Sequence, residues 1–406
     1  MSNIYDILEE RGFISQVTDQ AALKKLLASE TITCYIGFDP TAPSLHVGSL
    51  LPLMALAHMR NAGHRPIAIL GGGTAMIGDP SGKTEMRKML SEDTIRENGK
   101  QLSEQIRKFI GKDGEVIDNA NWLLDLSYIA FLRDIGRHFS VNRMLSFESY
   151  KIRLEKGLSF LEFNYQLLQA YDFLVLFREH DCKLQMGGDD QWGNIVAGMD
   201  LIRRVESKPA YGLTLPLLQT ASGEKMGKTA GGAVWLSGVQ TKPYDFYQYF
   251  RNVDDRDVER FLGFFTFLPM EQVRELGQKQ DAELNSAKEV LAHEVTAIVH
   301  GQEAADQARA AAQSVFGGQN AGAQGIPTTE ISQDRLSQGV LLVDLYAEVG
   351  LCKSKSEARR LITQGGARIE DRRVGDINDK LTIEDLTDGT VLIRAGKKKV
   401  HRISKK

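Results

Sequence analysis

A strand–helix–strand pattern near the N-terminus constrains the fold of this chain most. Residues 31–38 (TITCYIGF) and 65–72 (RPIAILGG) are rich in β-branched and aromatic residues and have glycine at or near their ends, which is typical of buried strands. Between them, residues 46–63 carry apolar side chains at helical spacing, and Gly63 stands where a C-terminal helix cap belongs. Two strands joined through a helix form a βαβ unit, so the sequence predicts a parallel sheet.

The remaining patterns predict an α/β fold with further domains. Residues 182–188 suggest another short strand and 194–207 another helix, which extends the unit into a doubly wound, Rossmann-like sheet domain. A helically patterned, alanine-rich run follows, and then a segment that is rich in Gly, Pro, Gln and Asn. The predicted domains are a sheet domain at 1–222, a loop and helical domain at 223–316, a linker at 317–338 and a small α+β domain at 339–406.

Composition places the chain among soluble globular proteins. Its 406 residues are 42% hydrophobic and 25% charged, and no apolar run approaches the ~18 residues of a membrane span. The acidic N-terminus lacks the pattern of a signal peptide. Cys34, Cys182 and Cys352 lie far apart without a CxxC pair, which favours reduced thiols, a cytoplasmic location and no cysteine-bound metal.

Charge is distributed unevenly along the chain. Residues 340–406 hold 15 Lys and Arg against 10 Asp and Glu, whereas the whole chain has a net charge of −3. A basic end on an acidic body is typical of nucleic-acid contact, because Lys and Arg attract phosphates. A merely solvated basic terminus fits this pattern equally well.

Two glycine-rich loops fail the standard nucleotide motifs. The segment GDPSGKT (78–84) resembles a P-loop, but the Walker pattern requires glycine where this chain has Ile77. The dinucleotide fingerprint beginning at Gly71 would need glycine at Met76. These loops therefore exclude a standard P-loop NTPase and a standard Rossmann dehydrogenase, and the run 71–73 is consistent with a tight bend after a strand.

Two other segments have the residue types that handle phosphates. His46 and Gly48 stand at the entrance of the predicted helix, whose free N–H groups favour an anion, although an isolated histidine there could simply cap the helix. About 180 residues later, SGEKMGKTAGG (222–232) places two lysines three residues apart between glycines. Such a loop can neutralise charge on a leaving pyrophosphate, or it can be a solvated basic turn.

Together, HVGS (46–49) and KMGKT (225–229) resemble the paired HIGH and KMSKS motifs of class I aminoacyl-tRNA synthetases. The resemblance to the bacterial tyrosyl-tRNA synthetase family covers essentially the whole chain, and 339–406 resembles the S-four-like RNA-binding domain of that family. It implies activation of tyrosine with ATP and transfer to tRNA(Tyr). The matching segments, in the family's order, are YIGFDPTAPSLHVG (35–48), GGGTAMIGDPSGK (71–83), NYQLLQAYDF (164–173) and QMGGDDQWGN (185–194).

The resemblance assigns a tyrosine site. Tyr35 and Asp172 match residues that contact the substrate hydroxyl, and Asp79, Tyr165, Gln169 and Gln191 match residues around its ammonium and carboxylate groups. From the sequence alone, positions 165, 169 and 172 lie on one face of a helix, where a polar surface stripe is the alternative.

For ATP, the resemblance implies binding and charge stabilisation without a covalent enzyme intermediate. Mg²⁺ would arrive with ATP, and no protein-bound metal is expected. The matching positions are Gly37, Asp39, Thr41, His46 and Gly48 near the first motif, Gly188 and Asp190 near the ribose, Lys225, Lys228 and Thr229 in the second motif, and Lys83 and Arg87 near the pyrophosphate.

For tRNA, the resemblance points to basic residues of the last domain. It also implies a homodimer joined through the sheet domain, for which 122–145 is a candidate pair of interface helices. The candidate tRNA contacts are Lys353, Lys355, Arg359, Arg360, Lys397, Lys398, Lys399 and Arg402.

Three positions depart from the family motifs. Ser49 replaces the second histidine of HIGH, Gly227 replaces a serine of KMSKS, and Asp189 replaces the serine of GGSDQWGN. The alternatives are the tryptophan enzyme of the same class, a small-molecule adenylyltransferase, and an RNA-binding protein with an inactive synthetase body. The basic end domain weighs against the second, and Tyr35 with Asp172 favours a phenol over an indole.

Overall fold

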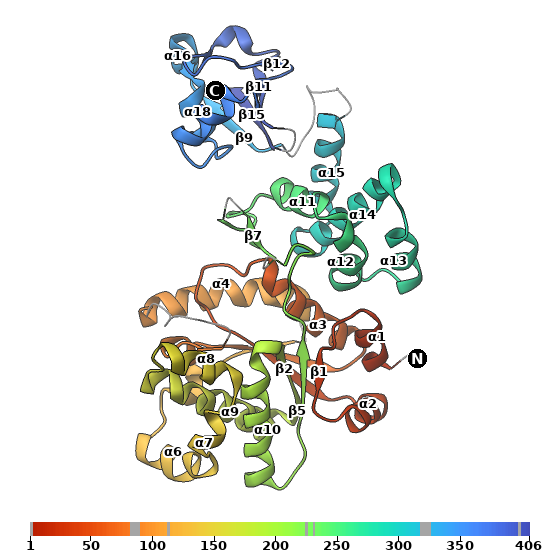
Figure 1. The fold of residues 1–406 in the computed structure, drawn as a ribbon, viewed down its shortest axis with the longest axis vertical. Coiled ribbons are helices and arrows are strands. Elements are labelled where there is room, and N and C mark those ends of the chain that lie inside the picture. The colour runs from red at the N-terminus through yellow and green to blue at the C-terminus, as the bar shows by residue number, and fades with distance from the viewer. Residues whose placement is uncertain are drawn as a thin grey trace. The chain divides into compact units, whose positions relative to one another are not determined.

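The computed structural model describes residues 3–81, 90–111, 114–223, 226–229, 232–316, 326–396 and 399–406. The chain divides into two compact units, each described here by itself (Figure 1). Unit 1 comprises Met1–Gly227, Trp235–Ser237 and Glu259–Gly277, and unit 2 comprises Lys228–Val234, Gly238–Val258 and Gln278–Lys406.

Unit 1 is built on a six-stranded sheet with the strand order β1-β6-β5-β2-β3-β4. Edge strand β1 is antiparallel to β6, and all the other neighbours are parallel. The predicted doubly wound parallel-sheet fold is confirmed. The strands are β1 Gln16–Val17, β2 Thr33–Phe38, β3 Arg65–Leu70, β4 Glu115–Asp118, β5 Cys182–Gly188 and β6 Tyr211–Leu215.

Helices cover both faces of this sheet, α3 and α4 on one side and α9 and α10 on the other (Figure 1). Alternate side chains of the strands enter the core, so Tyr35 and Ile67 pack with Phe173 of α9. The helices of unit 1 around the sheet are α1 Ile4–Glu10, α2 Gln20–Ser29, α3 Leu50–Asn61, α4 Glu92–Ile110, α8 Glu148–Lys156, α9 Phe160–His180, α10 Trp192–Glu206 and α13 Met270–Gly277, together with most of α12 Val258–Phe265.

The direction in which the sheet is wound reverses between β2 and β5. From β2 the chain proceeds outward to β3 and β4, whereas from β5 it proceeds the other way to β6. In open α/β sheets the loops at the carboxyl ends of two such strands separate and leave a crevice, which is where ligands bind. The topology alone therefore places a site beyond Phe38 and Gly188.

The segment 122–145 differs from the predicted pair of helices. It forms several short helical turns, α5 Ala120–Leu123, α6 Tyr128–Asp134, η3 Gly136–His138 and α7 Val141–Met144. The predicted pair of helices is therefore divided into shorter turns, while its role as a dimer interface stays a prediction. Tyr128 and Ile129 are 58% and 71% exposed instead of covering a core.

A buried ion pair joins α8 to the start of α9. Arg153 Nε donates to Glu162 Oε1 at 3.0 Å, and Arg153 Nη2 donates to Glu162 Oε2 at 3.1 Å. The Glu162 carboxylate also accepts from the backbone N–H and the hydroxyl of Ser159, which closes a capping box at the first turn of α9. This cluster fixes where α9 begins.

Replacing Arg153 by Met should lower the free energy of unfolding by about 3 kcal/mol, because it leaves the Glu162 carboxylate buried without its cation. Urea denaturation of both variants would measure this. Arg133→Met is the matched control, since Arg133 forms an exposed ion pair with Asp134, and it should leave the midpoint unchanged. Equal shifts for the two variants would contradict the role given to the buried pair.

Unit 2 contains a group of helices and a small C-terminal sheet. The helices α11 Pro243–Arg251, α14 Asp281–His300 and α15 Gln302–Phe316 pack on one another, and β7 Lys228–Thr229 pairs with β8 Gly232–Ala233. The C-terminal sheet has the order β12-β11-β14-β15-β9, with β10 and β13 paired separately. Its elements are β9 Thr328–Ile331, α16 Gln333–Gln338, β10 Val340–Leu341, α17 Leu342–Glu348, α18 Lys355–Thr363, β11 Ala367–Ile369, β12 Arg372–Arg373, β13 Lys380–Leu381, β14 Thr390–Ala395 and β15 Lys399–Lys405.

The end of the predicted linker 317–338 is folded. Strand β9 pairs in parallel with β15, and Ile331 and Leu336 join the core of the C-terminal part with Tyr346 and Ile393. This part therefore begins before residue 339. Among the described residues, no helix is both long enough and apolar enough to cross a membrane.

Candidate active site

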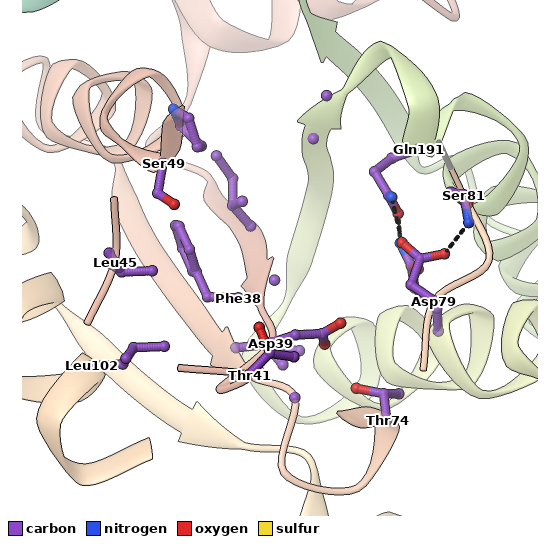
Figure 2. A pocket seen from close by; sticks show the side chains of 18 of the residues that line it. Phe38, Asp39, Thr41, Leu45, Ser49, Thr74, Asp79, Ser81, Leu102 and Gln191 are labelled. Carbon is purple, nitrogen blue, oxygen red and sulfur yellow. Dashed lines mark hydrogen bonds between the residues drawn. The ribbon is translucent and has the colours of Figure 1, made fainter. Parts of the chain in front are cut away.

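A cavity of about 500 Å³ opens in unit 1 at the carboxyl ends of β2 and β5, where the topology places a site (Figure 2). This volume lies in the range of small-molecule and nucleotide sites. Phe38 and Ser49 lie on one side of it, and Asp79 and Gln191 lie on the other, across from them. Asp39 and Thr41, which follow β2 directly, lie between the two sides.

One face of α9 contributes the three polar side chains that the sequence predicted to share a stripe. Tyr165, Gln169 and Asp172 all line the cavity. Tyr165 and Asp172 are buried, at 5% and 3% exposed, so the alternative of a polar surface stripe is excluded. Helical spacing alone brings them together, because positions i, i+4 and i+7 project in similar directions.

Asp172 lines the cavity and accepts two side-chain hydrogen bonds. Asn119 Nδ2 donates to its Oδ2 at 2.9 Å, and Trp122 Nε1 donates to its Oδ1 at 2.8 Å. Burial, against these two hydrogen bonds, raises the pKa of Asp172 to about 7. Tyr35 on β2 also lines the cavity, and among the described residues its buried hydroxyl has no hydrogen-bond partner.

A second set of hydrogen-bonded polar side chains in the cavity is centred on Asp79. Gln191 Nε2 donates to Asp79 Oδ2 at 2.7 Å, and the Ser81 N–H donates to Asp79 Oδ1 at 2.8 Å (Figure 2). Gln169 Nε2 donates in turn to Gln191 Oε1 at 3.2 Å. Burial and, less strongly, the negative charge of Asp39 raise the pKa of Asp79 to about 6.

The first of the two predicted phosphate-binding segments, HVGS (46–49), lies at the start of α3. His46 Nδ1 accepts from the Gly48 N–H at 2.9 Å, so the histidine caps the short helix η1 Val47–Ser49, as the simpler interpretation expected. Because Nδ1 accepts, the proton of a neutral ring is on Nε2, which remains a donor. A Cβ at Gly48 would lie 2.6 Å from the imidazole, so glycine is needed at this position.

Part of the second motif packs on the first. An ideal Cβ at Gly227, whose φ is +87°, would lie 3.2 Å from the backbone nitrogen of Gly48, and one at Gly48 would lie 3.7 Å from the Met226 carbonyl oxygen. Trp235, which follows the motif, forms a β-bridge with His46. Two segments about 180 residues apart therefore meet at the mouth of the cavity.

Further predicted residues also line the cavity. Gly37 has open space where its Cβ would be, which leaves room for a ligand against β2, whereas a Cβ at Gly188 would lie 2.6 Å from the Asp190 carboxylate. The cavity thus brings together Tyr35, Gly37, Asp39, Thr41, His46, Gly48, Asp79, Tyr165, Gln169, Asp172, Gly188, Asp190 and Gln191.

Several predicted positions are not tested by this geometry. Lys83, Arg87, Lys225, Lys397 and Lys398 lie outside the described residues. Lys228 and Thr229 are described only by their backbone, as β7 in unit 2.

The predicted tRNA contacts that the structure describes lie on or beside α18 and on β15. Lys353, Arg359 and Arg360 are exposed. Lys355 forms an ion pair with Asp344 at 3.0 Å, and Lys399 Nζ donates to the Leu351 carbonyl at 3.2 Å. Arg402 is half-buried on β15.

Sequence reasoning missed the residues that support the predicted ones. Asn119 and Trp122 hold Asp172, and Asn194 donates to Gln169 Oε1 at 3.0 Å. Asn119 follows β4 at the same edge of the sheet as the loops after β2 and β5, so its place after a strand is a signal that could have identified it. Nothing local marks Trp122.

Comparisons with known proteins identify the class of enzyme to which this fold and cavity belong. A family model described as tRNA synthetases class I (W and Y) matches residues 27–317. The solved structure of a C-terminally truncated mitochondrial tyrosyl-tRNA synthetase from Aspergillus nidulans is 30% identical with a TM-score of 0.71, and the match covers 78% of this chain and 95% of that one. This class of enzyme shares the fold described above.

Further comparisons identify one family within this class. A model described as the tyrosine–tRNA ligase SYY-like C-terminal domain matches residues 319–403. Tyrosine–tRNA ligases from Clostridium botulinum (strain Loch Maree / Type A3) and Desulfosudis oleivorans are 55% and 53% identical, with matches that cover 99% of this chain and 99% and 98% of those proteins. The chain belongs to the tyrosine–tRNA ligase family.

Proposed function

We propose that the cavity at the ends of β2 and β5 binds tyrosine and ATP side by side and joins them. The family gives the overall activity: the chain is a class I aminoacyl-tRNA synthetase that attaches tyrosine to tRNA with the use of ATP. The roles of individual residues below are the proposal.

The observation that carries the proposal is the pairing of Tyr35 with Asp172. A buried phenol that has no hydrogen-bond partner among the described residues lies near a buried carboxylate, whose charge helps to raise the pKa of Tyr35 after burial itself. A substrate phenol between them would donate to Asp172 and accept from Tyr35. Phenylalanine would leave the Tyr35 hydroxyl buried and unpaired and would give the Asp172 carboxylate no donor beyond Asn119 and Trp122, which is unfavourable.

The other end of tyrosine fits the set of polar side chains centred on Asp79. Its ammonium would face the Asp79 carboxylate with Tyr165 and Gln169, and Gln191 would orient the carboxylate that reacts. These four side chains line the cavity, and Tyr165 and Gln169 lie on α9 together with Asp172. The hydrogen bonds between Gln191, Gln169 and Asp79 hold this arrangement in place before tyrosine binds.

ATP would lie across the mouth of the cavity. Gly37 leaves open space for a ribose against β2, and Gly48 and Gly188, which have no Cβ, keep the His46 ring and the Asp190 carboxylate close to the backbone beside it. Asp39, Thr41 and Asp190 offer oxygen ligands, and His46 Nε2 would donate to a phosphate oxygen. Mg²⁺ would enter with the ATP phosphates; among the described residues, no cluster of three His, Cys, Asp or Glu could hold a metal ion. We propose that Lys83, Arg87, Lys225, Lys228 and Thr229 neutralise the pyrophosphate.

Catalysis then consists of positioning and charge stabilisation. A carboxylate oxygen of tyrosine attacks the α-phosphorus of ATP, and the bond from that phosphorus to the pyrophosphate oxygen breaks. No enzyme group forms a covalent bond. The adenylate carbonyl is next attacked by a terminal ribose hydroxyl of tRNA, and AMP leaves.

Assembly and location complete the proposal. Apolar residues exposed in unit 1, among them Tyr128, Ile129 and Phe160, fit a homodimer interface. A solution mass of twice the chain mass would support a dimer, and a monomer mass would contradict it. The three cysteines are free and buried, which fits a cytoplasmic location and would be checked by cell fractionation.

Amino-acid-dependent pyrophosphate exchange tests the proposal most directly. The assay follows label from pyrophosphate into ATP with tyrosine, with tryptophan and with no amino acid. We expect exchange with tyrosine alone. Exchange with tryptophan would favour the alternative enzyme of this class, exchange without amino acid would favour an adenylyltransferase, and no exchange would indicate an inactive body.

Acid should weaken tyrosine binding through Asp79. Because burial raises the pKa of Asp79 to about 6, roughly a tenth of this carboxylate remains ionised at pH 5, and only the ionised form attracts the ammonium. We expect kcat/KM for tyrosine in exchange to fall at least about tenfold from pH 7 to pH 5. Asp79→Asn should lower it at pH 7 and make the acid-side decrease shallower. An unchanged slope in this variant would contradict the role of Asp79.

A further inference from the structure

Asp189 is the one acidic departure from the family motif, and its side chain accepts three hydrogen bonds. Its Oδ2 accepts from the Ser15 hydroxyl at 2.7 Å. Its Oδ1 accepts from the Thr214 hydroxyl at 2.6 Å and from Gln16 Nε2 at 3.2 Å. These three donors come from β1, the residue before β1, and β6, all far from Asp189 in the sequence.

The chemistry of these donors favours a carboxylate. Thr214 Oγ1 already accepts from the Gln16 N–H at 3.1 Å, so its own proton is directed to Asp189. Three donors therefore converge on one side chain, and a carboxylate accepts on two oxygens without bringing a donor of its own. A serine would have a single oxygen for all three.

The turn that carries Asp189 connects these partners to the cavity. Helix η4 consists of Asp189, Asp190 and Gln191, and the last two line the cavity together with Gly188. Gln191 reaches Asp79 at 2.7 Å, and Asp190 folds back over Gly188. One side of the turn thus faces the proposed substrates, and Asp189 ties the turn to the sheet edge.

We infer that Asp189 is a positioning residue for tyrosine activation. It holds η4 through Ser15, Gln16 and Thr214, so that Asp190 and Gln191 are oriented toward ATP and tyrosine. This inference rests on the proposed function of the cavity. Small displacements of groups that orient substrates lower rates strongly, since the reacting atoms then miss their alignment. Edge strand β1 thereby contributes to the site without touching it.

The test compares Asp189→Ala with wild type in tyrosine-dependent pyrophosphate exchange. We expect kcat/KM for ATP and for tyrosine to fall about 10- to 100-fold, while the melting temperature moves no further than in the control. Asp200→Ala is the matched control, because Asp200 is also partly buried and ion-paired, to Arg143 and Arg203, but does not line the cavity. Asp189→Asn, which keeps one acceptor oxygen in place, should recover most of the activity.

Ser15→Ala and Thr214→Val test the same hydrogen bonds by removing the donors in place of the acceptor. Each removes one donor and should lower kcat/KM several-fold, and Thr214→Val should have little added effect on top of Asp189→Ala. These variants decide the question if Asp189→Ala does not fold. The inference is overturned if Asp189→Ala, or both donor variants, keep kcat/KM within twofold of wild type. It is also overturned if Asp200→Ala lowers kcat/KM as much as Asp189→Ala does. No exchange by the wild-type chain would instead overturn the proposed function.

Discussion

Ending the chain at residue 316 should leave tyrosine-dependent pyrophosphate exchange within about twofold of the full chain and lower kcat/KM for tRNA charging on the order of 1000-fold. The cavity is lined entirely by residues of unit 1 before 237, so activation does not need the C-terminal part. That part has its own core around Tyr346 and its own sheet. We propose that its exposed basic residues hold tRNA phosphates, which contribute most of the affinity and make it depend on salt.

Point variants of the full chain make this prediction specific. Arg359→Gln and Arg360→Gln together should weaken charging at 150 mM salt and reduce its salt dependence, because two phosphate contacts are lost. Arg335→Gln is the matched control, since Arg335 lies in the same part of the chain but is ion-paired to Glu348. Unimpaired charging by the shortened chain, or equal effects of the two sets of variants, would refute the proposal that the C-terminal part binds tRNA while unit 1 activates tyrosine.

The parts of the fold that sequence predicted are those with local signals. Strand β5 was predicted at 182–188, where the structure has it, and β2 and β3 within two residues at either end. The α9 stripe was also predictable, because helical spacing fixes which side chains share a face. Since the carboxyl ends of parallel strands meet at one edge, the strand ends then indicate the site.

The parts that sequence did not predict depend on distant partners. Strand β1 has two residues and exists because β6 lies beside it, and β9 was assigned to a linker because its partner β15 is about 70 residues away. The role of Asp189 was equally invisible, since its three donors come from residues 15, 16 and 214. In 122–145 the apolar pattern fitted either a core or an interface, and the structure contains both environments: Trp122 and Phe131 pack against the core, whereas Tyr128 and Ile129 are exposed.

Asp172→Ala should reduce the preference for tyrosine over phenylalanine about 1000-fold. With tyrosine, the variant loses a charge-assisted hydrogen bond to the substrate hydroxyl. With phenylalanine, it removes a buried carboxylate that the apolar ring would leave without a donor from the substrate. The two effects act in the same direction, so the ratio of the two kcat/KM values in pyrophosphate exchange is the measurement. If the variant discriminated as strongly as wild type, the hydroxyl would have to be recognised elsewhere.

Two further variants separate recognition from a damaged fold. Asp172→Asn keeps the volume but places an amide N–H₂ against Asn119 Nδ2 or Trp122 Nε1, both donors, so it should also discriminate poorly. Asp118→Asn is the control, because Asp118 ends the neighbouring strand β4 and caps the Gly72 and Ala120 N–H groups without lining the cavity. It should retain the full preference for tyrosine. Loss of preference in Asp118→Asn alone would assign discrimination to the loop after β4, and not to the carboxylate at 172.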